Sequence, residues 1–196
     1  APTPTYQSTP QREEVGIEPQ CVDCLHGFSS MTDRSLRLDS ANRPHVAYGG
    51  RHLYYAAFDG TDWHVEIVDD TSSVGRYASL ALDSAGYPHI GYYDTLNRSL
   101  KYAHWTGEAW EIGFVADMGI PRNDTGVIAL TLGAWGNPRI SYYDVNDHVI
   151  KYAQWIEGEW SIQPVTQEED PSVALSMVLD AAGYPHVSYV GYGTGR

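Results

Sequence analysis

The chain has 196 residues, 42% of them hydrophobic, which is enough for one domain with a hydrophobic core. Its formal net charge is -13 and it holds only 12 Lys and Arg, so clusters of basic residues that neutralise phosphates are not expected. These totals argue against a nucleic-acid partner, and the lack of a run of about 18 apolar residues argues against membrane insertion.

The N-terminal segment, residues 1–34, opens on Ala-Pro-Thr-Pro-Thr and has the form of a mature or trimmed N-terminus. Its two cysteines, Cys21 and Cys24, are spaced as CxxC, which suits a local disulfide, a pair of free thiols or half of a zinc site. His26 lies close, but there is no second CxxC for zinc and no βαβ pattern for a thioredoxin-like site. Cysteine usage in secreted chains favours the disulfide.

A tandem repeat begins after this segment. Its shared proline stands at positions 44, 88, 138 and 185, so the intervals are 44, 50 and 47 residues. Periods of this length with four strands each are typical of β-propeller blades. We assign the repeats to residues 35–76, 77–126, 127–173 and, as a partial copy, 174–196.

Each complete repeat is expected to form four strands, which in the clearest copy span residues 79–83, 89–94, 100–105 and 110–117. In the third of these strands, Leu100 and Tyr102 point to one face while Ala103 and Trp105 point to the other, so neither face is wholly polar. Sheets buried on both faces favour stacked blades. The sequence therefore predicts an all-β protein, a β-propeller of about four four-stranded blades.

The two ends of the chain read as halves of one more blade. The C-terminal copy supplies a first and a second strand and stops at Arg196, while residues 15–23 align with residues 109–117 as a fourth strand. The neighbourhood of Tyr6 is a candidate third strand. We expect the N-terminal strands to complete the last blade, either in the same chain or in a neighbouring subunit.

The motif Leu-Asp-Ser-Ala-Gly-Tyr-Pro-His-Ile-Gly-Tyr-Tyr-Asp, followed by Leu-Lys-Tyr-Ala-His-Trp and Gly-Glu-Ala-Trp, resembles a tandem-repeat family of secreted bacterial and archaeal surface proteins. The resemblance implies an extracellular or cell-surface location and a propeller-like fold, and it transfers no catalytic residue. The turns at Gly60–Trp63 and Gly107–Trp110 are similar to the tail of the Asp-box of sialidase-type propellers. That match is incomplete, because Asp59 directly precedes Gly60 and Thr106 precedes Gly107.

Three histidines follow the repeat proline, His45, His89 and His186, and Arg139 takes their place in the third copy. A role repeated in every blade favours a structural hydrogen bond over ligand contact or catalysis. Asp94 and Asp144 end the second strand of their repeats, with Asp124 and Asp147 in nearby loops. Such aspartates favour turn capping, while a calcium site or acid–base chemistry at this rim stays open.

Two aromatic series recur, Trp105 and Trp155 with Phe58, and Trp63, Trp110 and Trp160. Most members are expected in the packing, and exposed ones could stack against sugar rings. Departures from the repeat, Arg139, Trp135 and the loop 117–127, are where a unique site is expected. The ligand-binding candidates are Tyr93, Asp94, Trp105, Trp135, Arg139, Tyr143, Asp144 and Trp155, and the candidate glycosylation sequons start at Asn97 and Asn123.

The leading functional hypothesis is a non-catalytic extracellular recognition or adhesion module that binds glycans or surface proteins through propeller loops and aromatic pockets. The first alternative is a structural subunit of an extracellular assembly or filament, formed by β-strand exchange between chains. The second is a sialidase-like carbohydrate hydrolase with Asp94 and Asp144 as its carboxylates. No cofactor is expected beyond the open question of calcium.

Overall fold

The structure is a computed structural model that describes residues 21–23, 31–121, 127–166 and 171–191. Every regular element within these ranges is a β-strand. In the same part of the chain, no helix is long and apolar enough to cross a membrane.

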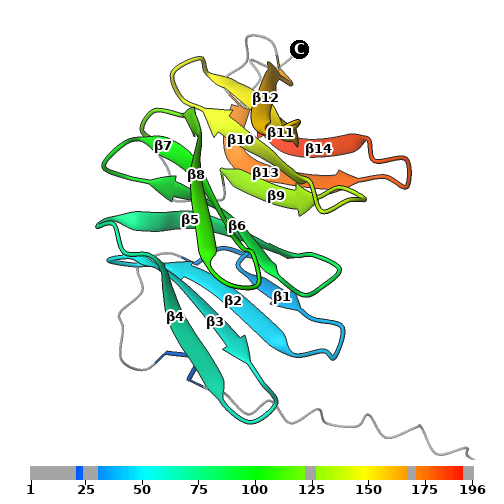
Figure 1. Ribbon diagram of the computed structural model, residues 1–196. Coiled ribbons are helices and arrows are strands. Elements are labelled where there is room, and N and C mark those ends of the chain that lie inside the picture. Colours follow the sequence, from blue (N-terminus) through cyan, green and yellow to red (C-terminus); the bar gives the residue numbers. More distant parts are fainter. Residues whose placement is uncertain (1–20, 24–30, 122–126, 167–170, 192–196) are drawn as a thin grey trace, which may run out of the picture.

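Three sheets are four-stranded antiparallel meanders whose strands pair in chain order (Figure 1). The first contains β1 (Leu36–Leu38), β2 (Pro44–Gly49), β3 (Leu53–Phe58) and β4 (Trp63–Asp69). The second contains β5 (Val74–Leu82), β6 (Pro88–Asp94), β7 (Ser99–Trp105) and β8 (Trp110–Asp117). The third contains β9 (Ile128–Leu132), β10 (Pro138–Asp144), β11 (Val149–Ile156) and β12 (Glu159–Pro164). The fourth sheet is the hairpin of β13 (Pro171–Leu179) and β14 (Pro185–Gly191).

The turn between the first two strands of a sheet is built by an aspartate and a residue in the left-handed region. In the second sheet, Asp83 Oδ1 accepts hydrogen bonds from the backbone N–H groups of Ala85 and Tyr87, both at 2.8 Å. Gly86 has a φ of 84° in this turn, and Asn42 takes the same place in the first sheet with a φ of 60°. Glycine and asparagine tolerate this region best, which explains the recurring Gly or Asn before the Pro-His pair.

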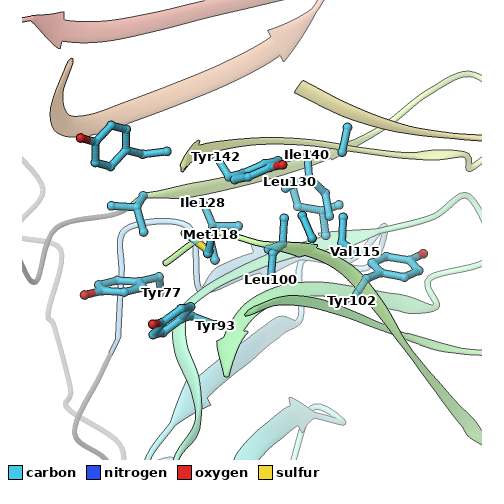
Figure 2. Packing of buried hydrophobic residues seen from close by; sticks show 14 of the residues in the cluster. Tyr77, Tyr93, Leu100, Tyr102, Val115, Met118, Ile128, Leu130, Ile140 and Tyr142 are labelled. Carbon is cyan, nitrogen blue, oxygen red and sulfur yellow. The ribbon is translucent and has the colours of Figure 1, made fainter. Parts of the chain in front are cut away.

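The sheets stack face to face in chain order, with the first sheet at one end and the hairpin at the other (Figure 1). β5 packs on the first sheet, β9 packs on the second, and β13 packs on the third. The largest cluster of buried apolar residues lies between the second and third sheets. Figure 2 shows Leu100 and Tyr102 on one side of this interface and Leu130 and Ile140 on the other. The predicted all-β propeller architecture is confirmed, with three complete blades and a two-stranded fourth among the described residues.

Polar contacts also join neighbouring sheets. Asp69, at the end of β4, accepts a hydrogen bond from Tyr92 Oη at 2.6 Å and forms an ion pair with Lys101 Nζ at 2.5 Å. Both partners belong to the second sheet. Burial raises the pKa of Asp69, but these contacts and two from Thr71 outweigh it and bring the pKa to about 2. The carboxylate is therefore charged at neutral pH and ties the first two blades together.

The first strand of the second sheet is longer than predicted, and part of the predicted N-terminal half-blade lies outside the described residues. The first strand of the second sheet starts at Val74 and not at residue 79, because two register shifts between Val74 and Ser79 break the alternation that defines a strand in sequence. The N-terminal strands expected around Tyr6 and over residues 15–20 lie outside the described residues. The described part of that segment, residues 21–23, lies against the first sheet, where Val22 packs against the buried cluster that contains Tyr48.

Candidate functional site

A groove of about 470 Å³ opens between the second and third sheets, and we call it the central groove. The second sheet contributes one wall through β6, β7 and β8, and the third contributes the other through β11, β12, the start of β10 and the turn before it. Its lining residues are His89, Tyr102, His104, Glu111, Ile112, Gly113, Phe114, Gly136, Pro138, Trp155 and Trp160.

Three rings form the wall from the second sheet. Tyr102 and His104 are alternate residues of β7 and therefore share a face, and His89 pairs with His104 across β6 and β7. The His104 ring stacks on Tyr102 at 5.4 Å and on His89 at 5.6 Å between centroids. His89 Nδ1 is hydrogen-bonded to the Tyr102 hydroxyl.

His89 is held neutral by its surroundings. Burial lowers its pKa to about 4, although the nearby Asp83 carboxylate, 3.8 Å from Nε2, acts in the opposite direction. Burial also raises the pKa of Tyr102. The same row of aspartate, histidine and tyrosine recurs in the first sheet, where His45 Nδ1 is hydrogen-bonded to the Tyr55 hydroxyl. This recurrence supports a structural role for the histidines, which hold the tyrosine side chains in place through a hydrogen bond.

The wall from the third sheet carries two indoles. Trp155 and Trp160 face each other across β11 and β12, with centroids 5.3 Å apart and planes at 71°. Trp160 also meets Tyr102 edge to face at 5.5 Å and packs against the main core. Trp155 is 37% exposed, so it offers aromatic surface to a ligand.

The polar and open parts of the central groove are specific to the second sheet. Gly113 stands opposite Tyr102, and a Cβ atom added there would meet nothing within 4 Å. In the first sheet, the residue opposite Tyr55 is Glu66, whose charge adds to burial in raising the pKa of Tyr55. Replacing glutamate with glycine at this place leaves free volume.

Beside that free volume, His104 pairs with Glu111, and Nε2 lies 3.6 Å from Oε2. The first sheet has Ala57 and His64 at the corresponding positions. The central groove therefore combines an exposed indole with a carboxylate and an imidazole. The indole has a counterpart in Trp105, but the imidazole–carboxylate pair has none in the first sheet.

A second hollow of about 610 Å³ lies between the third sheet and the hairpin, at their first turns. It brings together Trp135, which is 90% exposed, and Arg139, two residues predicted from their departure from the repeat. Arg139 donates a hydrogen bond to the Gly183 carbonyl. Its guanidinium lies where an aspartate side chain would stand if the third repeat had one, since a Cβ at Gly133 would lie 3.2 Å from Nε. The loop position Asp124 and the sequon at Asn123 lie outside the described residues.

Four of the other predicted ligand-binding residues, Tyr93, Asp94, Tyr143 and Asp144, are buried in blade packing or turns, and the fifth, Trp105, is partly buried. Tyr93 donates its hydroxyl hydrogen bond to the Gly119 carbonyl at 2.7 Å. Asp94 accepts from Asn97 Nδ2 at 2.8 Å and caps the turn after β6 through two backbone N–H groups. Trp105 meets Trp110 edge to face at 5.7 Å.

Asp144 and Tyr143 end β10 in the same way. Asp144 accepts a hydrogen bond from the Asn146 backbone N–H at 2.9 Å and forms an ion pair with Lys151 Nζ at 2.7 Å. The same ammonium also pairs with Asp147. The Tyr143 hydroxyl lies 3.4 Å from His148 Nδ1. These contacts agree with turn capping by the aspartates.

Metal and cysteine predictions have separate outcomes. Within the described ranges, no group of three or more His, Cys, Asp or Glu side chains is arranged to hold a metal ion, and calcium stays a sequence-based expectation. Cys21 is disulfide-bonded, and Cys24 lies outside the described residues.

Sequence reasoning picked Trp155 but missed His104, Glu111, Gly113 and Phe114 as groove residues. The signal was present, because these positions differ from their partners in the first repeat. Which differences share one surface depends on how two sheets pack, and a single-strand period does not supply that information.

No family model matches the sequence, and no curated protein matches it either. Among solved structures, a fucose lectin from Kordia zhangzhouensis is 18% identical, with 68% of this chain and 98% of the lectin covered and a TM-score of 0.43. A luciferin-regenerating enzyme is 11% identical, with 79% and 54% covered and a TM-score of 0.46. An endo-arabinase from Bacteroides thetaiotaomicron is 14% identical, with 83% and 74% covered and a TM-score of 0.43. At these scores the fold assignment rests on the strand pairing of the chain itself.

Proposed function

We propose that the protein is a non-catalytic carbohydrate-binding module and that the central groove is its site. The observation that carries the proposal is the exposed Trp155 indole across from the open space at Gly113 and the polar pair His104 and Glu111. Sites for small ligands are mostly apolar hollows with a few polar groups that fix orientation, and this groove has that composition.

Each part of the groove suits one part of a sugar ring. The C–H face of a pyranose packs on an indole, and Trp155 supplies that surface, with Phe114 also exposed at the groove. Glu111 accepts hydrogen bonds from sugar hydroxyls, and the His104 imidazole can donate or accept one. Because the groove carries Glu111 and the chain carries a net charge of -13, neutral sugars are favoured over acidic ones.

Binding is a better account of the groove than hydrolysis. Glycoside hydrolysis ordinarily uses two carboxylates, and Glu111 is the one carboxylate among the described lining residues. Asp94 and Asp144, the acid–base candidates of the hydrolase alternative, are buried in their turns. An extracellular location, where surface glycans are met, is part of the proposal and accords with the disulfide-bonded Cys21.

The test is a glycan-array screen followed by calorimetry with the best neutral ligand. Trp155→Ala should weaken binding at least tenfold through loss of the stacking surface. Gly113→Glu, which copies the first sheet, should abolish binding by filling the groove while leaving the fold intact. Trp135→Ala is the matched control, since this exposed tryptophan lies in the other hollow, and it should bind like the parent.

Absence of binding to every neutral glycan at millimolar concentration would refute the proposal. If Trp135→Ala lost binding while Gly113→Glu still bound like the parent, the site would instead be the hollow beside Arg139.

A further inference from the structure

The first sheet exposes apolar residues that the other sheets bury. Each sheet has an equivalent apolar pair between its first two strands. The pairs are Leu36 with Val46, Leu80 with Ile90, Leu130 with Ile140 and Met177 with Val187. Leu80, Leu130 and Met177 are at most 7% exposed, because each is covered by the preceding sheet. Leu36 is 52% exposed and Leu38 is 59% exposed. On the same face, Val46 and Tyr48 of β2 are 5% and 1% exposed, so the uncovered part of this outer face is β1.

The hairpin exposes the opposite half of the same interface. The side chains of His45 and His89 are 12% and 8% exposed, whereas that of His186, at the same place in β14, is 65% exposed. Val178 of β13, which pairs with His186, is 62% exposed, whereas Ala81 at the matching position is 8% exposed. Within the described part of the chain, no further strand pairs with the free edge of β14.

The outer face of the first sheet also keeps the polar contact that marks an internal interface. Tyr48 donates a hydrogen bond to Asp23 Oδ2 at 2.6 Å, as Tyr92 does to Asp69 Oδ2 at 2.6 Å. Val22 packs in the cluster of Tyr48, and Val68, the residue before Asp69, belongs to the cluster of Tyr92. Residues 22 and 23 therefore pack against the first sheet in the way that residues 68 and 69, at the end of β4, pack against the second sheet.

We propose that these two end faces bind each other between copies of this chain, so that β13–β14 of one copy covers the exposed β1 side of the first sheet of the next. The two faces are the two halves of the interface that the chain already uses three times between its own sheets. They lie at opposite ends of the stack (Figure 1), so each copy offers one face to a copy on either side. Such a heterologous contact builds an open filament or a closed ring.

Light scattering across a concentration series tests the association. The parent chain should run at two or more times its single-chain mass at high concentration. Leu36→Glu and Val178→Glu, each a change of an exposed residue on one face, should each run as a monomer. Leu96→Glu is the matched control, since Leu96 is 64% exposed and lies in the turn after β6, and it should associate like the parent.

Mixing the two monomeric variants distinguishes head-to-tail contact from any symmetric one. Leu36→Glu retains an intact hairpin face and Val178→Glu retains an intact first-sheet face, so the mixture should form a one-to-one dimer and nothing larger. A strictly monomeric parent, which is the result of closure within one chain, would overturn the proposal, as would a mixture that stays monomeric. Both variants should retain the sugar affinity of the parent, so failure of association and failure of the proposed function are measured separately.

Discussion

At the scale of single residues, recurrence separates structural side chains from ligand-binding ones. His89 and His45 make the same hydrogen bond to a tyrosine in successive sheets, which marks them as packing elements. Glu111 and Gly113 have no such counterpart in the first sheet, which has His64 and Glu66 there. A repeat protein that binds one ligand in one groove is expected to break its repeat at that groove.

The buried His89 predicts a pH dependence of stability. Its pKa is about 4 in the folded chain against 6.5 when exposed, so the unfolded state takes up the proton first as the pH falls. Stability should therefore decline between pH 6.5 and pH 4, by roughly 3 kcal/mol at most for this group. Urea unfolding at pH 7.5, 5.5 and 4.5 measures this decline.

His89→Gln isolates the contribution, because it keeps the polar contact with Tyr102 and removes the titration. The difference between the two proteins should shrink as the pH falls through that window. His64, whose pKa is raised by its hydrogen bond to Asp59, contributes with the opposite sign in both proteins and cancels in the difference. An unchanged difference from pH 7.5 to 4.5 would show that His89 is not held neutral.

At the scale of elements, the sequence was sufficient for the strands that follow a two-residue period between glycine turns. The strands from residue 89 to residue 117 were predicted within one residue of β6, β7 and β8. β5 was predicted too short, because Gly75 and Tyr77 adopt positive φ angles of 90° and 57° inside it. Backbone conformations of this kind leave no mark on the alternation of side chains.

The contact between the first two sheets depends on one carboxylate. Asp69 is 4% exposed and pairs with Lys101, so Asp69→Ala leaves a nearly buried ammonium and the Tyr92 hydroxyl without their acceptor. We expect a loss of about 3 to 5 kcal/mol in the free energy of unfolding. Urea denaturation measures it, with Asp70→Ala as the exposed neighbouring control, expected within about 0.5 kcal/mol of the parent. Equal stability of the two variants would mean that Asp69 does not join the sheets.

At the scale of the whole molecule, the chain is a row of similar sheets in which each contacts its neighbours. Which faces lie at the ends, and which groove is open, depend on packing between sheets. The repeat predicted the number and order of the sheets but not these features. That is why five of the eight ligand-binding candidates, Tyr93, Asp94, Trp105, Tyr143 and Asp144, lie in packing or turns, while Trp155 lies in the central groove.

The net charge of -13 sets the salt dependence of the proposed association. Copies repel one another at low ionic strength, and the Debye length falls from about 30 Å at 0.01 M to about 10 Å at 0.1 M salt. The average mass at fixed concentration should therefore rise with added salt. A mass that falls with salt would mean that ion pairs, and not the apolar faces of Leu36 and Val178, hold the copies together.

The central claim is that a neutral sugar binds in the groove beside Trp155. The most direct measurement is a two-dimensional NMR titration of the six tryptophan indole N–H signals, assigned by single substitutions. The signals of Trp155 and Trp160 should shift in proportion to the fraction of protein that has bound sugar, while the signals of Trp63 and Trp135 should not shift. Shifts confined to Trp135, or no shift at millimolar sugar, would contradict the assignment of the central groove as the binding site.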